Sequence, residues 1–212
     1  DCDACADWNR PRAPFVLHGK SWYVGTEGLS AVLIDGGDGL VLIDGALPQS
    51  APLITASIES LGFSLGDVKW ILNSHPHFDH AGGIAALQRL SGARVASTVR
   101  GAQALRLGNA PHDDPQAGFG PEANAFPPVA EVSELADGAV LTLGGLSLVL
   151  HATPGHTPGG ATWAWRSCDE GDCRNLVYAD SLVVMKAIAH ALLVEPGAGF
   201  FHGVAIGNTI QN

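Results

Sequence analysis

The stretch Ser74-His75-Pro76-His77-Phe78-Asp79-His80 places three histidines and an aspartate within six positions. Neutral imidazole and carboxylate groups are common zinc ligands. Alternate residues share one face in extended backbone, and Pro76 disfavours the helical region for the residue before it. His75 and His77 can therefore point the same way from a strand end or a tight loop. Because four ligand-type side chains are so close together, a metal site explains the stretch better than isolated core histidines do.

The flanking residues indicate a strand before this stretch and a helix after it. Residues 68–73 are apolar and partly β-branched, which is typical of a short buried strand. Residues 81–90 have the pattern of a helix. The ligand-type side chains would then leave the end of a strand and begin a helix, where rigid elements can hold them in place.

Length and composition favour one domain covering residues 1–212, and the hydrophobic content of 46% suffices for a sizeable core. The net charge of −10 counts against a nucleic-acid partner, which would need a basic surface. The same charge counts against attachment to anionic membranes. No apolar run reaches the length of a transmembrane helix.

Four cysteines bear on the cellular compartment. Cys168 and Cys173 are expected to form a small disulfide-closed loop between two strands. Cys2 and Cys5 could pair with each other or stay free, and a zinc ribbon would need a second C-x-x-C pair. A disulfide implies an oxidising compartment, the periplasm or the exterior. The first residues show no signal-peptide pattern, so we expect that any such peptide has been removed.

The rest of the chain alternates short apolar runs with turn signals and helical patterns. Residues 1–14 are expected to form a polar arm, and residues 108–128 a long loop that is functional or mobile. Two hairpins are predicted from apolar runs that flank glycine-rich turns. The predicted strands are residues 21–25, 30–35, 40–44, 93–97, 139–143, 146–151, 161–165 and 176–179, and the further predicted helices are residues 48–62 and 99–107.

The order H-x-H-x-D-H resembles the metallo-β-lactamase superfamily of metallohydrolases. Two later stretches match its next motifs in order, the first of them containing His156. Both stretches, and several shorter ones, resemble subclass B3 metallo-β-lactamases, and the match covers about residues 7–183. The shorter stretches are Trp8-Asn9, Pro14-Phe15, Trp22-Tyr23-Val24-Gly25-Thr26 and Leu42-Ile43-Asp44-Gly45, and the two motifs are Pro154-Gly155-His156-Thr157-Pro158-Gly159-Gly160 and Tyr178-Ala179-Asp180-Ser181-Leu182.

The resemblance implies an α/β fold, the αβ/βα sandwich, with metals at one edge. It also implies a β-lactam amide hydrolase that uses zinc and a metal-bound hydroxide. Such an enzyme would act as a monomer on small β-lactam antibiotics and would confer antibiotic resistance. By this resemblance, His75, His77 and His156 would bind the first zinc, and Asp79 and His80 would bind the second. Asp79 would also be catalytic, because it would orient the nucleophile. Ser181 would contact the substrate.

The chain departs from this family pattern at about Val184. The family's last second-zinc ligand, a histidine in a His-Pro context, is missing, and neither His190 nor His202 has that context. Residues 183–194 are apolar and residues 197–212 are glycine-rich, as a truncated or frame-shifted reading frame would give. We therefore expect a sandwich that is incomplete in its C-terminal half. With only two protein ligands, the second zinc should bind weakly.

Two other functions fit the same motifs. A glyoxalase-II-like thioester hydrolase or lactonase would use Asp180 to bridge two metals, although export and a disulfide count against a cytosolic thioester enzyme. A non-catalytic remnant binding one zinc is the alternative from a different class. Metal content and turnover of a β-lactam would separate the three.

Overall fold

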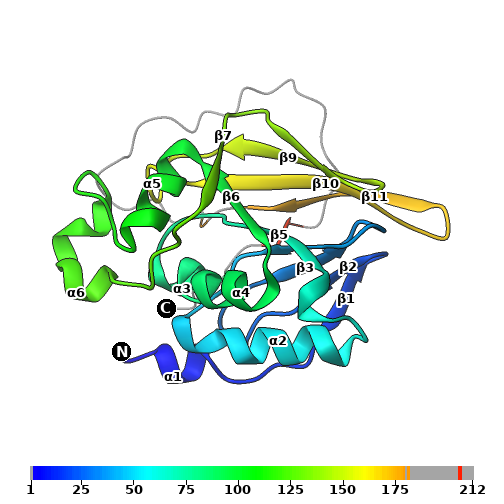
Figure 1. Ribbon diagram of the computed structural model, residues 1–212, viewed down its shortest axis with the longest axis horizontal. Coiled ribbons are helices and arrows are strands. Elements are labelled where there is room, and N and C mark those ends of the chain that lie inside the picture. The colour runs from blue at the N-terminus through cyan, green and yellow to red at the C-terminus, as the bar shows by residue number, and fades with distance from the viewer. Residues whose placement is uncertain (1, 180, 182–204, 207–212) are drawn as a thin grey trace.

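The computed structural model describes residues 2–179, 181 and 205–206, which form two β-sheets with helices beside them (Figure 1). The first sheet contains, in spatial order, β1 (Phe15–His18), β2 (Ser21–Tyr23), β3 (Val32–Asp35), β4 (Leu40–Ile43), β5 (Val68–Leu72), β6 (Arg94–Thr98) and β7 (Val132–Leu135). The second contains β12 (Ala205–Ile206), β11 (Asp172–Tyr178), β10 (Ala161–Asp169), β9 (Leu146–Ala152) and β8 (Val140–Leu143). The helices are α1 (Cys5–Trp8), α2 (Ala51–Ser60), α3 (Phe78–Ala81), α4 (Ile84–Ser91), α5 (Val99–Leu107) and α6 (Pro121–Asn124), with 3₁₀ turns η1 (Pro48–Ser50), η2 (Leu65–Asp67) and η3 (Pro115–Phe119).

The central strands β3 and β4 of the first sheet are buried on both faces, and the alternation of their side chains explains how. Leu33 of β3 packs into a core with residues of α2, α4 and α5. Its neighbours Val32 and Ile34 pack into a second core against Trp163 and Tyr178 of the other sheet. Successive strand residues point to opposite faces, so one apolar strand contributes to both layers. Figure 1 shows α2 and α4 on one side of the first sheet and β9, β10 and β11 on the other.

The strand directions bring the functional loops to one edge of the first sheet. β4, β5, β6 and β7 run parallel to one another, with helices in the connections between them. In such sheets the carboxyl ends of the strands carry the ligand-binding loops. The loops that follow Ile43 and Leu72, and the start of α5 after Thr98, therefore lie at the same edge.

Most predicted elements are present, but the helix predicted at residues 81–90 is divided. α3 ends at Ala81 and α4 begins at Ile84, with Gly82 and Gly83 between them. A Cβ atom on Gly83 would lie 2.2 Å from the carbonyl oxygen of Gly45, so only glycine permits this approach. The residues just after β4 therefore pack directly against the segment that follows the histidine loop.

Other parts of the chain contain more structure than was predicted. The N-terminal arm includes α1, and the loop of residues 108–128 includes η3 and α6. β1 and β7 were not predicted. β12 pairs with β11 in parallel, so two residues of the atypical tail add a strand to the second sheet. Among the described residues, no helix is long and apolar enough to cross a bilayer.

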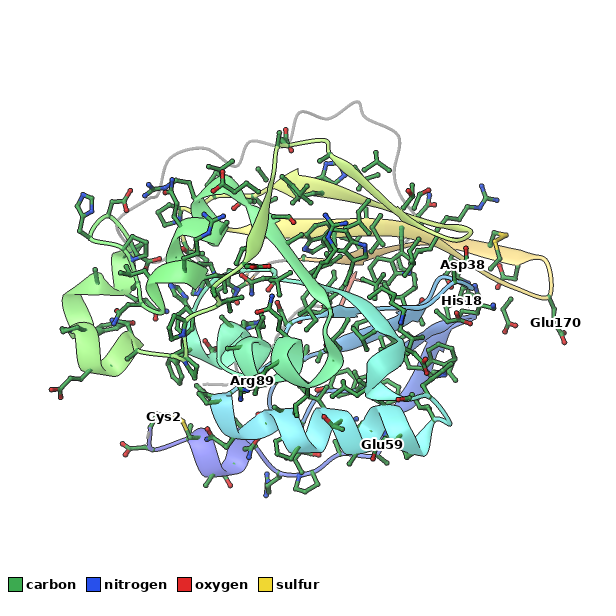
Figure 2. The ribbon with its side chains drawn as sticks, in the orientation of Figure 1. Cys2, His18, Asp38, Glu59, Arg89 and Glu170 are labelled. Carbon is green, nitrogen blue, oxygen red and sulfur yellow. A yellow bond between two sulfur atoms is a disulfide. The ribbon has the colours of Figure 1, made fainter. Side chains whose placement is uncertain are left out.

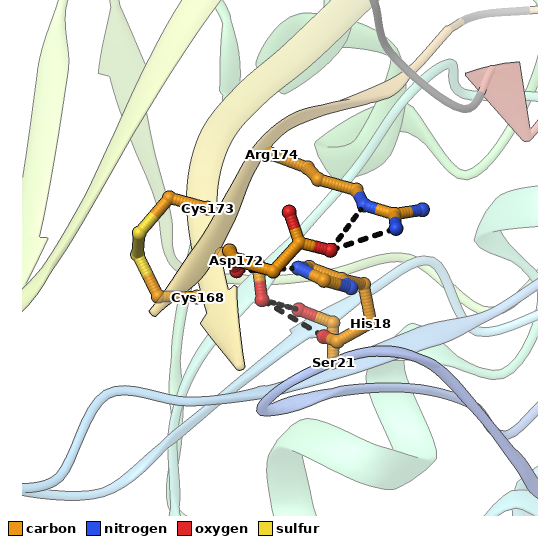
Figure 3. The surroundings of a disulfide bond; sticks show 7 residues. His18, Ser21, Cys168, Asp172, Cys173 and Arg174 are labelled. Atoms are coloured by element: carbon orange, nitrogen blue, oxygen red, sulfur yellow. Dashed lines mark hydrogen bonds and ion pairs between the residues drawn. A yellow bond between two sulfur atoms is a disulfide. The ribbon is translucent and has the colours of Figure 1, made fainter. Parts of the chain in front are cut away.

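The predicted Cys168–Cys173 disulfide is present and closes the hairpin of β10 and β11 (Figure 3). The two cysteines are directly opposite in the antiparallel register. Glu170 and Gly171 have φ values of 45° and 94°, as a two-residue hairpin turn with two positive φ angles requires. Figure 2 shows Glu170 at the outer tip of this hairpin. Cys2 and Cys5 also form a disulfide, which decides between the two states left open for them.

We expect the Cys168–Cys173 disulfide to contribute modestly to stability. The loop it closes is short, with a sequence separation of 5, and the loop-closure entropy removed from the unfolded chain is correspondingly small. Replacing both cysteines by serine should lower the free energy of unfolding by about 2 kcal/mol. Urea denaturation of the oxidised protein and of the double variant measures this. Equal midpoints would contradict the expectation.

Candidate metal centre

The histidine loop begins at the carboxyl end of β5 and continues into α3. His77 is extended, with φ −94° and ψ 156°, and its carbonyl oxygen accepts hydrogen bonds from the backbone of His80 and Ala81. Asp79 and His80 therefore lie on the first turn of a helix. His75, His77 and His80 are 0%, 2% and 3% exposed, so the loop holds imidazoles in the interior.

His156 approaches from the second sheet, on the connection between β9 and β10. The backbone of Ala161 donates a hydrogen bond of 2.7 Å to the carbonyl oxygen of Ser74, which joins this connection to the histidine loop. Thr98, at the end of β6, donates through Oγ1 to the carbonyl oxygen of Gly159. A Cβ atom on Gly159 would lie 2.8 Å from the backbone of Gly101. The glycines of this segment thus allow His156 to approach the sheet edge.

The structure brings all five predicted ligand residues together in two overlapping groups. Potential ligand atoms of His75, His77 and His156 lie within 4.8 Å of one another, and so do those of His75, Asp79 and His80. Nδ1 of His77 is 3.1 Å from Nε2 of His156. Two nitrogens on one tetrahedral zinc, each at about 2.0–2.1 Å, lie about 3.3 Å apart. The donor types and their spacing therefore fit zinc. His75 is close to both groups, whereas the sequence analysis assigned it to the first zinc alone.

The electrostatic surroundings hold these groups in the forms that bind cations. Burial, reinforced by His80 and His77, holds the pKa of His75 well below its usual range, so its imidazole is neutral at pH 7. Burial alone would raise the pKa of Asp79, but His80, His75 and His77 outweigh it and lower that pKa. Metal ligation requires neutral imidazole and ionised carboxylate, and this pocket favours both.

Asp44 is an important residue of the site to which the sequence analysis assigned no role. It follows β4, is 0% exposed, and has a φ of 64°. One carboxylate oxygen accepts hydrogen bonds from the Ser74 backbone at 2.7 Å and from Asn73 at 3.1 Å. The other accepts from Ser74 Oγ, from His80 Nδ1 at 2.9 Å and from Tyr178 at 3.0 Å. Asp44 thereby fixes the start of the histidine loop and the ring of His80.

Asp114 is the second residue that was missed, because it lies in the stretch predicted only as a functional or mobile loop. It is 4% exposed. Its carboxylate lies 3.1 Å from His77 Nε2 and accepts a hydrogen bond of 2.6 Å from Thr157. Burial would raise the pKa of Asp114, but these hydrogen bonds and one from the Gln116 backbone lower it to about 2. The loop therefore places an ionised carboxylate directly behind a predicted zinc ligand.

The remaining predicted site residues follow β11 in the chain. Ser181 is half-buried and lies shortly after β11, and its contact with substrate stays a prediction. Asp180, His190 and His202 lie outside the described residues, as does the apolar stretch of residues 183–194. The weakness of a second zinc site and the extent of the domain also stay predictions.

Comparison with known families identifies the fold. The model of the metallo-beta-lactamase superfamily matches residues 24–169. The chain belongs to this superfamily. The predicted αβ/βα sandwich is therefore confirmed, and so is the resemblance that the H-x-H-x-D-H motif indicated.

Solved structures of this superfamily show strong similarity. Rm3 metallo-beta-lactamase is 50% identical with a TM-score of 0.82, covering 88% of this chain and 69% of the other. MEM-A1, a subclass B3 metallo-beta-lactamase from a soil metagenome library, is 50% identical with a TM-score of 0.80, covering 85% and 68%. The predicted likeness to subclass B3 is thus confirmed.

Curated relatives within the superfamily have a different name. The hydroxyacylglutathione hydrolase of Anaeromyxobacter dehalogenans (strain 2CP-C) is 31% identical over 163 residues, which cover 71% of this chain and 51% of that protein. The chain therefore spans about half the length of this relative.

Proposed function

We propose that this chain is a zinc-dependent hydrolase of β-lactams, similar to subclass B3 enzymes. The observation that supports it best is the pair of ligand groups around His75, in a chain whose sequence is 50% identical to that of a solved subclass B3 enzyme. The ligand chemistry supports a metallohydrolase directly. The β-lactam substrate rests on similarity, because one fold can support several chemistries.

The residues present would divide the work of such a reaction. His75, His77 and His156 would hold one zinc ion, and Asp79 and His80 would hold the second. Bound zinc would polarise the lactam carbonyl and bring the pKa of water toward neutrality. Asp79, kept ionised by the surrounding imidazoles, would also accept a hydrogen bond from the attacking water and orient it toward that carbonyl. No covalent serine intermediate is needed, so Ser181 would at most contact the substrate.

The proposal extends to compartment and partners. Two disulfides support an oxidising location, the periplasm or the exterior, where a β-lactamase would meet antibiotics. The net charge of −10 supports a small-molecule substrate rather than nucleic acid. We propose that the protein acts there as a monomer and confers antibiotic resistance.

A thioester hydrolase of the glyoxalase II type is the second candidate, favoured by the name of the Anaeromyxobacter relative. Identity to that relative is 31%, against 50% for MEM-A1, which is why we prefer the β-lactamase. A remnant that binds one zinc without catalysis is the third.

Turnover by purified zinc-loaded protein tests the choice. We expect nitrocefin and a carbapenem to be hydrolysed and S-lactoylglutathione to remain intact, with activity removed by a chelator and restored by zinc. Thioester cleavage without β-lactam hydrolysis would favour the second candidate. Zinc binding without either activity would favour the third.

A further inference from the structure

We propose that Asp114 is a positioning residue that fixes the ring of His77 so that Nδ1 faces the zinc site. The inference rests on the zinc site of the proposed function, but not on its substrate. Each oxygen of the Asp114 carboxylate lies 3.1 Å from His77 Nε2. Both oxygens also accept hydrogen bonds from other groups, one from the Gln116 backbone and the other from Thr157 Oγ1. Because both oxygens act as acceptors, Nε2 is the atom that carries the hydrogen in this contact.

The position of that hydrogen decides which nitrogen of His77 can bind a cation. In a neutral imidazole one nitrogen donates and the other carries the lone pair. With Nε2 donating to Asp114, the lone pair is on Nδ1, which lies 3.1 Å from Nε2 of His156. Both residues belong to the three-histidine group that fits zinc. The opposite tautomer would direct a hydrogen into this group and leave a buried carboxylate facing a lone pair.

Asp114 is itself held firmly. Thr157 Oγ1 donates to it at 2.6 Å, and the Gln116 backbone donates at 2.8 Å, because Asp114 is the N-cap residue of η3. Thr157 follows His156 directly, so one carboxylate contacts a predicted ligand and the neighbour of another. Histidines that bind metal commonly donate their other N–H to a carboxylate, which sets tautomer and ring orientation. Through Asp114, the loop of residues 108–128 thus contacts both the loop that carries His77 and the loop that carries His156.

The test is the zinc affinity of the full chain carrying Asp114→Asn. The amide has nearly the same shape, but it can donate as well as accept and no longer selects the Nε2–H tautomer. We expect zinc affinity to fall about 10–100-fold, measured by competition with a chromophoric chelator. Asp113→Asn is the matched control, because Asp113 is the adjacent carboxylate, its side chain is 44% exposed, and it pairs with Arg100. That control should bind zinc like the wild type.

Two further measurements separate positioning from general support of the fold. Long-range ¹H–¹⁵N spectra of the metal-free protein should show His77 with its hydrogen on Nε2 in the wild type and a mixture of tautomers in Asp114→Asn. Thr157→Val keeps the carboxylate and removes one of its donors, so it should reduce zinc affinity less than Asp114→Asn does. If Asp114→Asn does not fold, the zinc affinity of Thr157→Val tests the inference instead. An affinity lower than that of the wild type would support it, and an unchanged affinity would overturn it.

Unchanged zinc affinity in the folded variants, or an unchanged His77 tautomer, would overturn the inference. A wild type that binds no zinc would overturn both this inference and the proposed function. A wild type that binds zinc and does not hydrolyse β-lactams would overturn the proposed function alone, and the affinity comparison would still judge Asp114.

Discussion

His77→Ala is expected to abolish tight zinc binding at the three-histidine group and β-lactam turnover together. The variant removes one of three imidazoles from a group whose donor atoms lie within 4.8 Å of one another. It also leaves the buried Asp114 carboxylate without the ring that donates to it. The loss should exceed the about 10–100-fold expected for removing an outer partner of a ligand. Zinc content after dialysis and nitrocefin turnover measure the two effects.

His151→Ala is the matched control for this variant. His151 lies on β9, is exposed, and is outside both ligand groups. The same change of side chain at this position should therefore leave zinc content and turnover near the wild-type values. If His77→Ala retained near-normal zinc and turnover, the assignment of the three-histidine group to the zinc would be wrong.

The histidine loop could be predicted from sequence because its information is local. An extended segment that starts a helix brings His75, His77, Asp79 and His80 into one region, whatever the rest of the fold does. His156 was different, because nothing in its own surroundings indicates a partner 79 positions away. Only the order of family motifs connected it to the loop. The structure brings these residues together, and their roles as zinc ligands stay a prediction.

The supporting carboxylates could not be predicted, because their partners are set by tertiary packing. Asp44 contacts Ser74, His80 and Tyr178 across separations of 30, 36 and 134 positions. Asp114 lies in a stretch whose prolines and glycines predicted a long loop, whereas the structure also places η3 and α6 there. Nothing in those residues indicated which side chains Asp114 would contact. The division of the helix at Gly82 and Gly83 has the same origin, since it depends on contact with Gly45.

Asp44→Ala is expected to destabilise the fold more than any surface change. The side chain is 0% exposed, and its carboxylate accepts hydrogen bonds from the residues at the start of the histidine loop, from His80 and from Tyr178. Each buried donor left without an acceptor costs about 1–3 kcal/mol, and this carboxylate accepts from several such donors. Alanine also tolerates the φ of 64° less well than aspartate does.

We therefore expect the free energy of unfolding to fall by about 3–5 kcal/mol, the cost of two or more buried donors without an acceptor. That is a large fraction of the about 5–15 kcal/mol typical of a domain. Chemical denaturation of metal-free protein measures this without the contribution of bound zinc. Asp44→Asn should lose less, because asparagine keeps the shape and accepts positive φ readily. Asp38→Ala is the control, since this exposed turn residue should change stability by no more than about 0.5 kcal/mol. An Asp44→Ala protein as stable as the Asp38→Ala control would show that the Asp44 network does not hold the histidine loop in place.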